Sequence, residues 1–197
     1  MRFRDALNPM LGSPTKLGLL RTLFASPSRS WTGRELAKAA DVSVAQAARD
    51  LRDLSETSLV TRVVVGKSYS WRLNSAHVLG PALADLFAHE AGLRSKLLHD
   101  LAEGLRSANL ERARLFGSIL RGDERADSDL DVYLEVRSSR DRPRAEEAID
   151  RVRSRLWDRF GNPISALIYT RAEASHPRNP ALLRTIEEEG VDLLQGG

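Results

Sequence analysis

Two carboxylates stand two positions apart where an apolar run begins. Asp129 precedes and Asp131 lies within the segment LDVYLEV (130–136), whose composition predicts a buried strand. Side chains of a strand alternate between its two faces, so both carboxylates are expected on one side, a few ångströms apart. Like charges that close repel each other, and one group is driven towards protonation unless a cation lies between them. Oxygen ligands at this spacing suit Mg²⁺, which binds one or two carboxylates together with substrate phosphates.

A phosphate-binding turn is expected shortly before these carboxylates. Gly117 and Ser118 end an apolar stretch, and Arg121, Gly122 and Ser128 follow in a polar loop. A glycine lets the backbone approach a phosphate, and a serine at a helix N-terminus can donate its hydroxyl to it. The simpler interpretation is a surface loop that leads into an acidic strand start, with no ligand.

These residues resemble the signature of the polymerase-β-like nucleotidyltransferase superfamily, and in particular its small "minimal" members. The resemblance covers about residues 108–194 and rests on a Gly-Ser, an Arg-Gly and a Ser-Asp-x-Asp motif, which comprise Gly117, Ser118, Arg121, Gly122, Ser128, Asp129 and Asp131. It implies a nucleoside triphosphate bound with Mg²⁺ by the two aspartates. It also implies transfer of a nucleotidyl group to a hydroxyl of a protein, an RNA or a small molecule.

The resemblance is incomplete at one position. Active members typically carry a third carboxylate on the third strand, which completes the metal site and helps to deprotonate the attacking hydroxyl. Ser165 is the expected occupant here, while Glu135 is roughly 13 Å along the strand from Asp131 and Glu173 lies past the end of the third strand. Two functions therefore stay open: an active nucleotidyltransferase, or an inactive transcriptional regulator or antitoxin-like protein that senses a nucleotide or binds a protein partner.

Composition describes an ordinary globular chain of 197 residues with two differently charged parts. The absence of cysteine excludes a disulfide scaffold and a cysteine-based metal or nucleophile site. No apolar run approaches the roughly 18 residues of a membrane span, and the N-terminus does not read as a signal peptide, so a cytoplasmic location without membrane contact is expected. Residues 1–75 contain 12 Lys/Arg against 6 Asp/Glu, a net +6, whereas residues 76–197 carry a net −3. The basic first part suggests a partner of opposite charge.

The basic part has the pattern of three helices followed by a β-hairpin. Apolar spacing predicts helices over 14–25 and 43–56, and a Thr32–Glu35 capping box predicts a short helix between them. Two β-rich runs, 59–65 and 68–73, flank a Gly-Lys turn. This order resembles a winged helix-turn-helix domain that binds double-stranded DNA.

In such a domain the third helix would enter a major groove. Its inward stripe is expected to be Val44, Ala47, Ala48, Leu51 and Leu54, with Asp50 and Asp53 among the outward residues. The side chains expected to contact bases or phosphates are Ser43, Gln46, Arg49, Arg62 and Lys67, with Arg72 beside them. The two outward aspartates weaken the electrostatic argument, and a winged helix used to bind another protein is the alternative.

The whole chain is predicted to be α+β. It divides into a winged helix at 1–75, a helical connector at 76–107 and a nucleotidyltransferase-like domain at 108–197. The last domain is expected to hold a mixed sheet with helices on one face, with helices at 142–159 and 178–190. Apolar residues of the connector exceed what one packed face needs, which predicts a homodimer.

Overall fold

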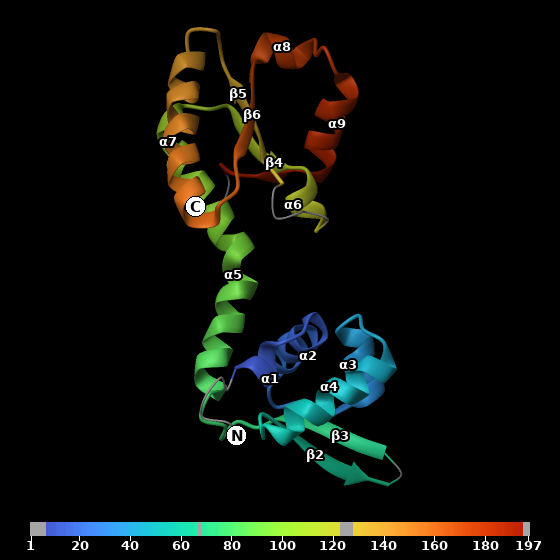
Figure 1. The fold of residues 1–197 in the computed structure, drawn as a ribbon. Coiled ribbons are helices and arrows are strands. Elements are labelled where there is room, and N and C mark those ends of the chain that lie inside the picture. Colours follow the sequence, from blue (N-terminus) through green and yellow to red (C-terminus); the bar gives the residue numbers. More distant parts are fainter. Residues whose placement is uncertain (1–6, 67, 123–127, 195–197) are drawn as a thin grey trace. The chain divides into compact units, whose positions relative to one another are not determined.

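The chain folds into two compact units, Met1–Gly92 and Leu93–Gly197, in the computed structural model (Figure 1). The structure describes residues 7–66, 68–122 and 128–194. Both units contain helices and strands, and the strands of each form a separate sheet, which confirms the α+β class. No helix among the described residues is long and apolar enough to cross a membrane.

The first unit contains the predicted three helices and hairpin in the predicted order. They are α2 (Pro14–Ala25), α3 (Gly33–Ala39), α4 (Val44–Glu56), β2 (Val60–Val65) and β3 (Ser68–Leu73). A short helix, α1 (Asn8–Leu11), lies in the segment 1–13, for which an arm or a short helix was expected, and one further element, β1 (Trp31–Thr32), was not predicted. The strands form an antiparallel sheet in the order β1-β3-β2, in which Trp31 pairs with Trp71.

Each of the three helices begins at a side chain that accepts a hydrogen bond from its first turn. Ser13 accepts from the Lys16 amide, and Ser43 accepts from the Gln46 amide. Thr32 and Glu35 form the predicted capping box, in which each side chain bonds the other residue's backbone N–H. Such caps satisfy amides that the helix itself leaves unpaired, so the sequence sets these three helix starts locally.

The orientation of α4 differs from the prediction at three residues. Asp50 is only 5% exposed and accepts hydrogen bonds from the Ser13 hydroxyl at 3.3 Å and the Gln46 side-chain amide at 3.1 Å. Conversely, Val44 is 53% exposed, and Ala48 is also exposed. The helix is turned so that Asp50 faces the N-terminus of α2, whose Ser13 provides a polar partner that sequence periodicity could not reveal.

The predicted connector corresponds to one helix, α5 (Gly80–Leu105), followed by a short 3₁₀ turn. Its two halves bury apolar residues in different units. Leu83 and Phe87 belong to the core of the first unit, whereas Leu97, Leu101 and Leu105 belong to the core of the second. Leu86 and Leu93 remain about half exposed, and the homodimer stays a prediction.

The second unit is built on a four-stranded mixed sheet in the order β6-β5-β4-β7. The strands are β4 (Arg112–Phe116), β5 (Leu130–Val136), β6 (Ile164–Thr170) and β7 (Val191–Asp192). β5 runs parallel to β6 and antiparallel to β4. The helices are α6 (Ser118–Arg121), α7 (Arg142–Phe160), α8 (Arg171–Ser175) and α9 (Pro180–Glu189), of which α8 was not predicted.

Alternate residues of β5 serve the two faces of this sheet. Leu130, Val132, Leu134 and Val136 enter the large core with α7 and the end of α5, as the prediction of helices on one face requires. The other face carries Asp131, Tyr133 and Glu135, since side chains alternate. A smaller cluster of Phe116, Tyr133 and Ile186 brings α9 onto that second face, which the prediction did not include.

Candidate functional site

The site is built at the junction between β4 and α6. Phe116, the last residue of β4, pairs with Asp131 of β5, and Gly117 follows with φ +88°. A Cβ atom on Gly117 would lie 2.3 Å from Asp131 Oδ2, so the carboxylate packs directly against the glycine backbone. Only glycine combines this backbone conformation with the required space. The position of the Asp131 carboxylate thus depends on the absence of a side chain at Gly117.

Asp131 is held in a destabilised charged form. Partial burial raises its pKa above the usual aspartate range, and the charge of Asp129 raises the pKa further. Asp129, which immediately precedes β5, is thus close enough for its charge to act on Asp131. The Arg121 guanidinium works in the opposite direction and lowers the pKa of Asp131.

The donor set fits a hard divalent cation. Two neighbouring carboxylates, one of them destabilised by the other, provide the oxygen ligands and the negative charge that Mg²⁺ prefers. Among the described residues no group of three or more His, Cys, Asp or Glu side chains could hold a metal ion. A cation at this position would therefore rely on the aspartate pair and on ligands from the substrate or water.

Arg121 pairs with a glutamate that is distant from it in the chain. Its Nη1 lies 3.4 Å from Glu189 Oε2 at the end of α9, and both side chains are about half exposed. Exposed pairs at this distance add little stability. Arg121 is thus paired with a carboxylate at the end of α9 and is also close enough to lower the pKa of Asp131. No local pattern could connect residues so far apart in the chain.

The remaining predicted residues of this site lie close to the same junction. Ser118 is the first residue of α6 and is partly buried, and Gly122 ends that helix in the left-handed conformation at φ +75°. Ser128 accepts a hydrogen bond through its carbonyl oxygen from the Asn162 side chain at 3.1 Å. This bond holds the backbone just before Asp129 next to the residues that lead into β6.

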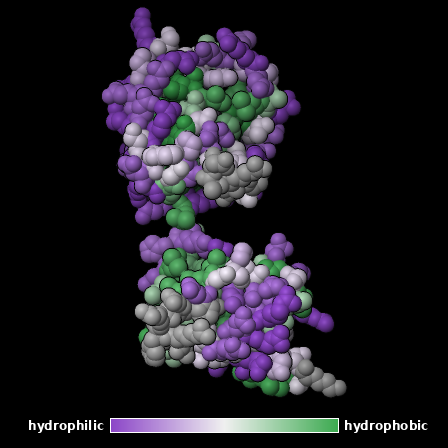
Figure 2. Space-filling model, in the orientation of Figure 1, coloured by the Kyte–Doolittle hydropathy of each residue, from purple (hydrophilic) through white to green (hydrophobic). Residues whose placement is uncertain are grey.

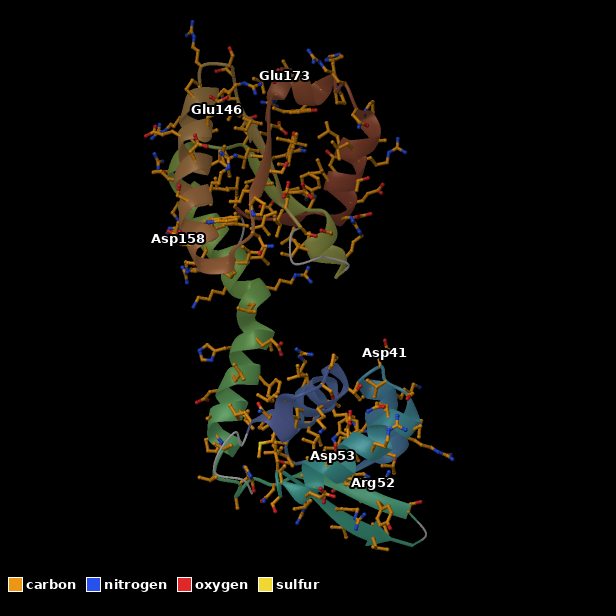
Figure 3. The ribbon with its side chains drawn as sticks, in the orientation of Figure 1. Asp41, Arg52, Asp53, Glu146, Asp158 and Glu173 are labelled. Atoms are coloured by element: carbon orange, nitrogen blue, oxygen red, sulfur yellow. The ribbon has the colours of Figure 1, made fainter. Side chains whose placement is uncertain are left out.

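Ser165 occupies the third-strand position opposite the aspartates. The parallel register of β5 and β6 pairs Asp131 with Ser165. Glu135 instead accepts a hydrogen bond from the Tyr133 hydroxyl at 3.1 Å, and Glu173 caps α8 and pairs with Arg142 at 2.6 Å (Figure 3). Neither glutamate replaces the carboxylate that Ser165 lacks. Glu135 is engaged near the far end of β5, and Glu173 is engaged in α8, beyond the far end of β6.

We expect Asp131→Asn to raise the melting temperature at about pH 7. The raised pKa means that ionised Asp131 costs free energy in the folded state, and asparagine removes this cost. As the pH falls below the ordinary aspartate range, the carboxyl group is protonated in both folded and unfolded chains, so the advantage should vanish. Melting curves across this pH range test the prediction, with exposed Asp158→Asn as control. An advantage that persists in acid would contradict it.

The first unit carries a second set of candidate residues. Ser43 uses its hydroxyl as the cap of α4, and Gln46 is bonded to Asp50 and accepts a short hydrogen bond from Arg49. Arg49 is exposed, and the Arg62 guanidinium lies 4.6 Å from the centre of the Tyr69 ring. Lys67, also predicted, lies outside the described residues.

Five arginines of this surface have no acidic partner among the described residues, and two nearby aspartates of α4 are engaged by other groups. Within the described chain no ion pair involves Arg34, Arg49, Arg52, Arg62 or Arg72. Asp50 is buried and Asp53 pairs with Lys16 at 2.9 Å, so the expected acidity of α4's outer face is largely removed. Hydrophilic residues gather over α3 and α4 in Figure 2. Arg34 and Arg52 were absent from the predicted set.

Comparison with known proteins finds one family similarity, which lies in the second unit. No curated protein matches the chain. A possible transcriptional regulator from Methanosarcina mazei Go1 is similar over 49% of this chain and 84% of its own, with 15% identity and a TM-score of 0.34. TrmBL2, an archaeal chromatin protein, is similar over 93% and 73%, with 17% identity and a TM-score of 0.30. Neither similarity is close enough to support an argument about function. Residues 98–193, which include the whole glycine–aspartate junction, match the family model "Nucleotidyltransferase domain".

Proposed function

We propose that the second unit binds a nucleoside triphosphate with Mg²⁺ through Asp129 and Asp131. The observation that carries the proposal is the packing of the Asp131 carboxylate on Gly117, with Asp129 beside it. This packing places negative charge next to a backbone that has no side chain to keep a phosphate away. Mg²⁺, when bound, would neutralise the aspartates and orient the phosphates.

The surrounding residues have separate roles in this proposal. The Gly117–Ser118 backbone and the Ser118 hydroxyl would donate hydrogen bonds to phosphate oxygens at the start of α6. Arg121, close enough to act on Asp131, would stabilise negative charge on the leaving pyrophosphate. Glu189 would hold the Arg121 side chain in place.

Transfer of the nucleotidyl group is the reaction that this site would perform. An acceptor hydroxyl would attack the α-phosphorus, the bond to pyrophosphate would break, and the hydroxyl proton would need a base. Ser165 stands where that base is expected and cannot serve as one. Any transfer by the protein as it stands should therefore be slow.

Ser165→Asp provides the test of transfer. We expect this variant to increase incorporation of label from α-³²P nucleotides into extract components, by roughly 100-fold if the carboxylate acts as a general base. Ser165→Asn is the matched control, with the same shape and no negative charge, and should leave incorporation unchanged. Equal incorporation by the Asp and Asn variants would show that this position does not limit transfer.

We also propose that the first unit is a winged helix that binds double-stranded DNA. The order of three helices and a hairpin, with β1 added to the sheet, supports this assignment. The arginines of α3, α4 and the hairpin that lack acidic partners support an anionic ligand. A protein partner remains the alternative function for the same surface.

The DNA proposal predicts a salt-dependent affinity. Arg49→Ala combined with Lys67→Ala should weaken binding to genomic duplex fragments and reduce the slope of log K against log salt by about two, if each contacts one phosphate. Arg178→Ala combined with Arg184→Ala removes two exposed charges from the second unit and should change neither quantity. Fluorescence anisotropy of labelled duplexes measures both. An absence of duplex binding at low salt would reject the proposal.

A regulator without transferase activity is the second candidate, and Ser165 is the observation that favours it. In this case the Mg-nucleotide, or a protein partner, would act as a signal at the aspartate site rather than as a substrate. A homodimer of this kind would read two half-sites of an operator. Nucleotide binding without measurable transfer, even in Ser165→Asp, would favour this candidate.

A further inference from the structure

A cleft of about 550 Å³ opens in the first unit between the start of α3, one side of α4 and the hairpin β2–β3. It lies entirely within residues 32–71 and so involves no part of the aspartate site. The rotation of α4 described above creates it, because Val44 and Ala48 face this space instead of the core. Its volume is in the range of small-molecule sites.

The inner surface of the cleft is apolar and aromatic. Trp71 and Leu51 lie at its base and are 4% and 0% exposed, respectively. Tyr69, which is 47% exposed, forms one wall, and Val44 and Ala48 form the other. Such a surface favours a flat organic ring, which gains burial and aromatic contact together.

The opening of the cleft is cationic. Arg34 of α3, Arg52 of α4 and Arg62 of β2 all line it, and no acidic residue does so among the described part of the chain. Arg62 stacks on Tyr69, which restricts its side chain before any ligand arrives. The nearest acids on α3 and α4 are engaged: Glu35 bonds the Thr32 amide and Asp53 pairs with Lys16 (Figure 3).

We propose that this cleft binds a small planar aromatic anion. Three arginines that have no acidic partner within the described part of the chain disfavour a cationic ligand and can hold a carboxylate, sulfonate or phosphate group by charge-assisted hydrogen bonds. The apolar walls formed by Val44, Ala48 and Tyr69 require more than an anionic group, because a hydrated phosphate of duplex DNA would leave these exposed side chains in contact with water. A ring with one acidic substituent can contact the apolar side chains of the cleft and pair with its arginines at the same time.

Occupation of the cleft should compete with duplex DNA. This second step rests on the proposed DNA-binding function, in which the exposed side of α4 and the hairpin meet the phosphate backbone. Arg52 and Arg62 belong to those same elements, so a bound anion would neutralise charge that DNA needs. Linkage requires the reverse as well, so DNA should weaken binding of the anion to the same extent.

The three tryptophan indoles allow a direct test by ¹⁵N–¹H NMR on the full chain, with signals assigned by Trp→Phe variants. The probe is 1-naphthoate, a flat two-ring carboxylate. We expect saturable movement of the Trp71 signal and none of Trp157, which lies on α7 in the second unit. Two control compounds should not move the Trp71 signal. Inorganic phosphate carries negative charge but has no ring, and 1-naphthylmethylamine has the ring but carries positive charge.

Variants separate the cleft from other sites. Arg34→Ala combined with Arg52→Ala should weaken naphthoate binding by about tenfold or more, since hydrogen bonds to a charged group are lost. Arg72→Ala, adjacent to Trp71 but outside the cleft, should not. Asp129→Asn with Asp131→Asn should also bind naphthoate normally, whatever becomes of nucleotide binding.

Two results would overturn the proposal. One is a Trp71 signal that does not move with naphthoate, or moves equally in the Arg34→Ala, Arg52→Ala variant. The other is a Trp71 signal that responds to duplex DNA but not to naphthoate, which would make the cleft a part of the DNA interface. Naphthoate binding in a protein that fails to bind DNA would support the site and reject only the DNA-binding function.

Discussion

Replacing Asp129 and Asp131 together by asparagine is expected to abolish the stabilisation that Mg-ATP or Mg-GTP gives to the wild-type protein. A ligand that binds only the folded state stabilises it by about 2.7 kcal/mol at a concentration roughly 100 times its Kd. The double variant keeps the shape of both side chains but removes the charges that would hold the cation. Its melting temperature should therefore be the same with and without Mg-nucleotide.

The control for this experiment changes the same number of charges elsewhere in the second unit. Asp158→Asn with Glu146→Gln alters two exposed residues of α7, on the helix that covers the opposite face of the sheet (Figure 3). This variant should keep the full nucleotide-induced shift. A shift of the same size in the wild type and in the Asp129→Asn, Asp131→Asn variant would show that the nucleotide binds elsewhere.

The second large effect is expected from Gly117→Ala. The new methyl group would lie 2.3 Å from Asp131 Oδ2, in a residue whose φ of +88° disfavours any side chain. Together the strain and the collision should destabilise the second unit by about 2–4 kcal/mol. The displaced Asp131 should also cost the protein its response to Mg-nucleotide. Urea unfolding and nucleotide titration measure the two effects.

A matched glycine and a double-mutant cycle make this prediction specific. Gly92→Ala places a methyl group in the helix α5 with nothing within 4 Å, and should stabilise the protein by about 0.5–1 kcal/mol. Asp131→Ala removes Oδ2 and Cγ, the two atoms that the Gly117→Ala methyl group would meet most closely, and leaves only Cβ at 3.3 Å. The two changes combined should therefore cost less than their sum, by about 1 kcal/mol or more. Strict additivity would mean that the Gly117–Asp131 contact does not determine the site.

The sequence by itself determined the features whose interacting residues lie a few positions apart in the chain, such as helix starts. The Thr32–Glu35 capping box and the Ser43 cap set helix starts because their partners are three residues away. The composition of LDVYLEV predicted the strand that became β5 and so placed Asp131 near its start, with Asp129 just before it. Ser165 could likewise be matched to Asp131 because adjacent parallel strands keep a simple register.

Contacts between segments distant in the chain decided which side of α4 is buried, which residue pairs with Arg121 and where the cleft of the first unit lies. Asp50 is inside because Ser13, 37 residues earlier, offers it a hydrogen bond, which no helical period encodes. Arg121 pairs with Glu189, and α9 covers the second face of the sheet, only because the chain returns to β4 through β7. The cleft in the first unit exists because the rotation of α4 leaves Val44 and Ala48 uncovered beside β2 and β3. Periodicity identifies which residues share a face, but only the packing of that face against other elements decides whether it is buried, charged or open to a ligand.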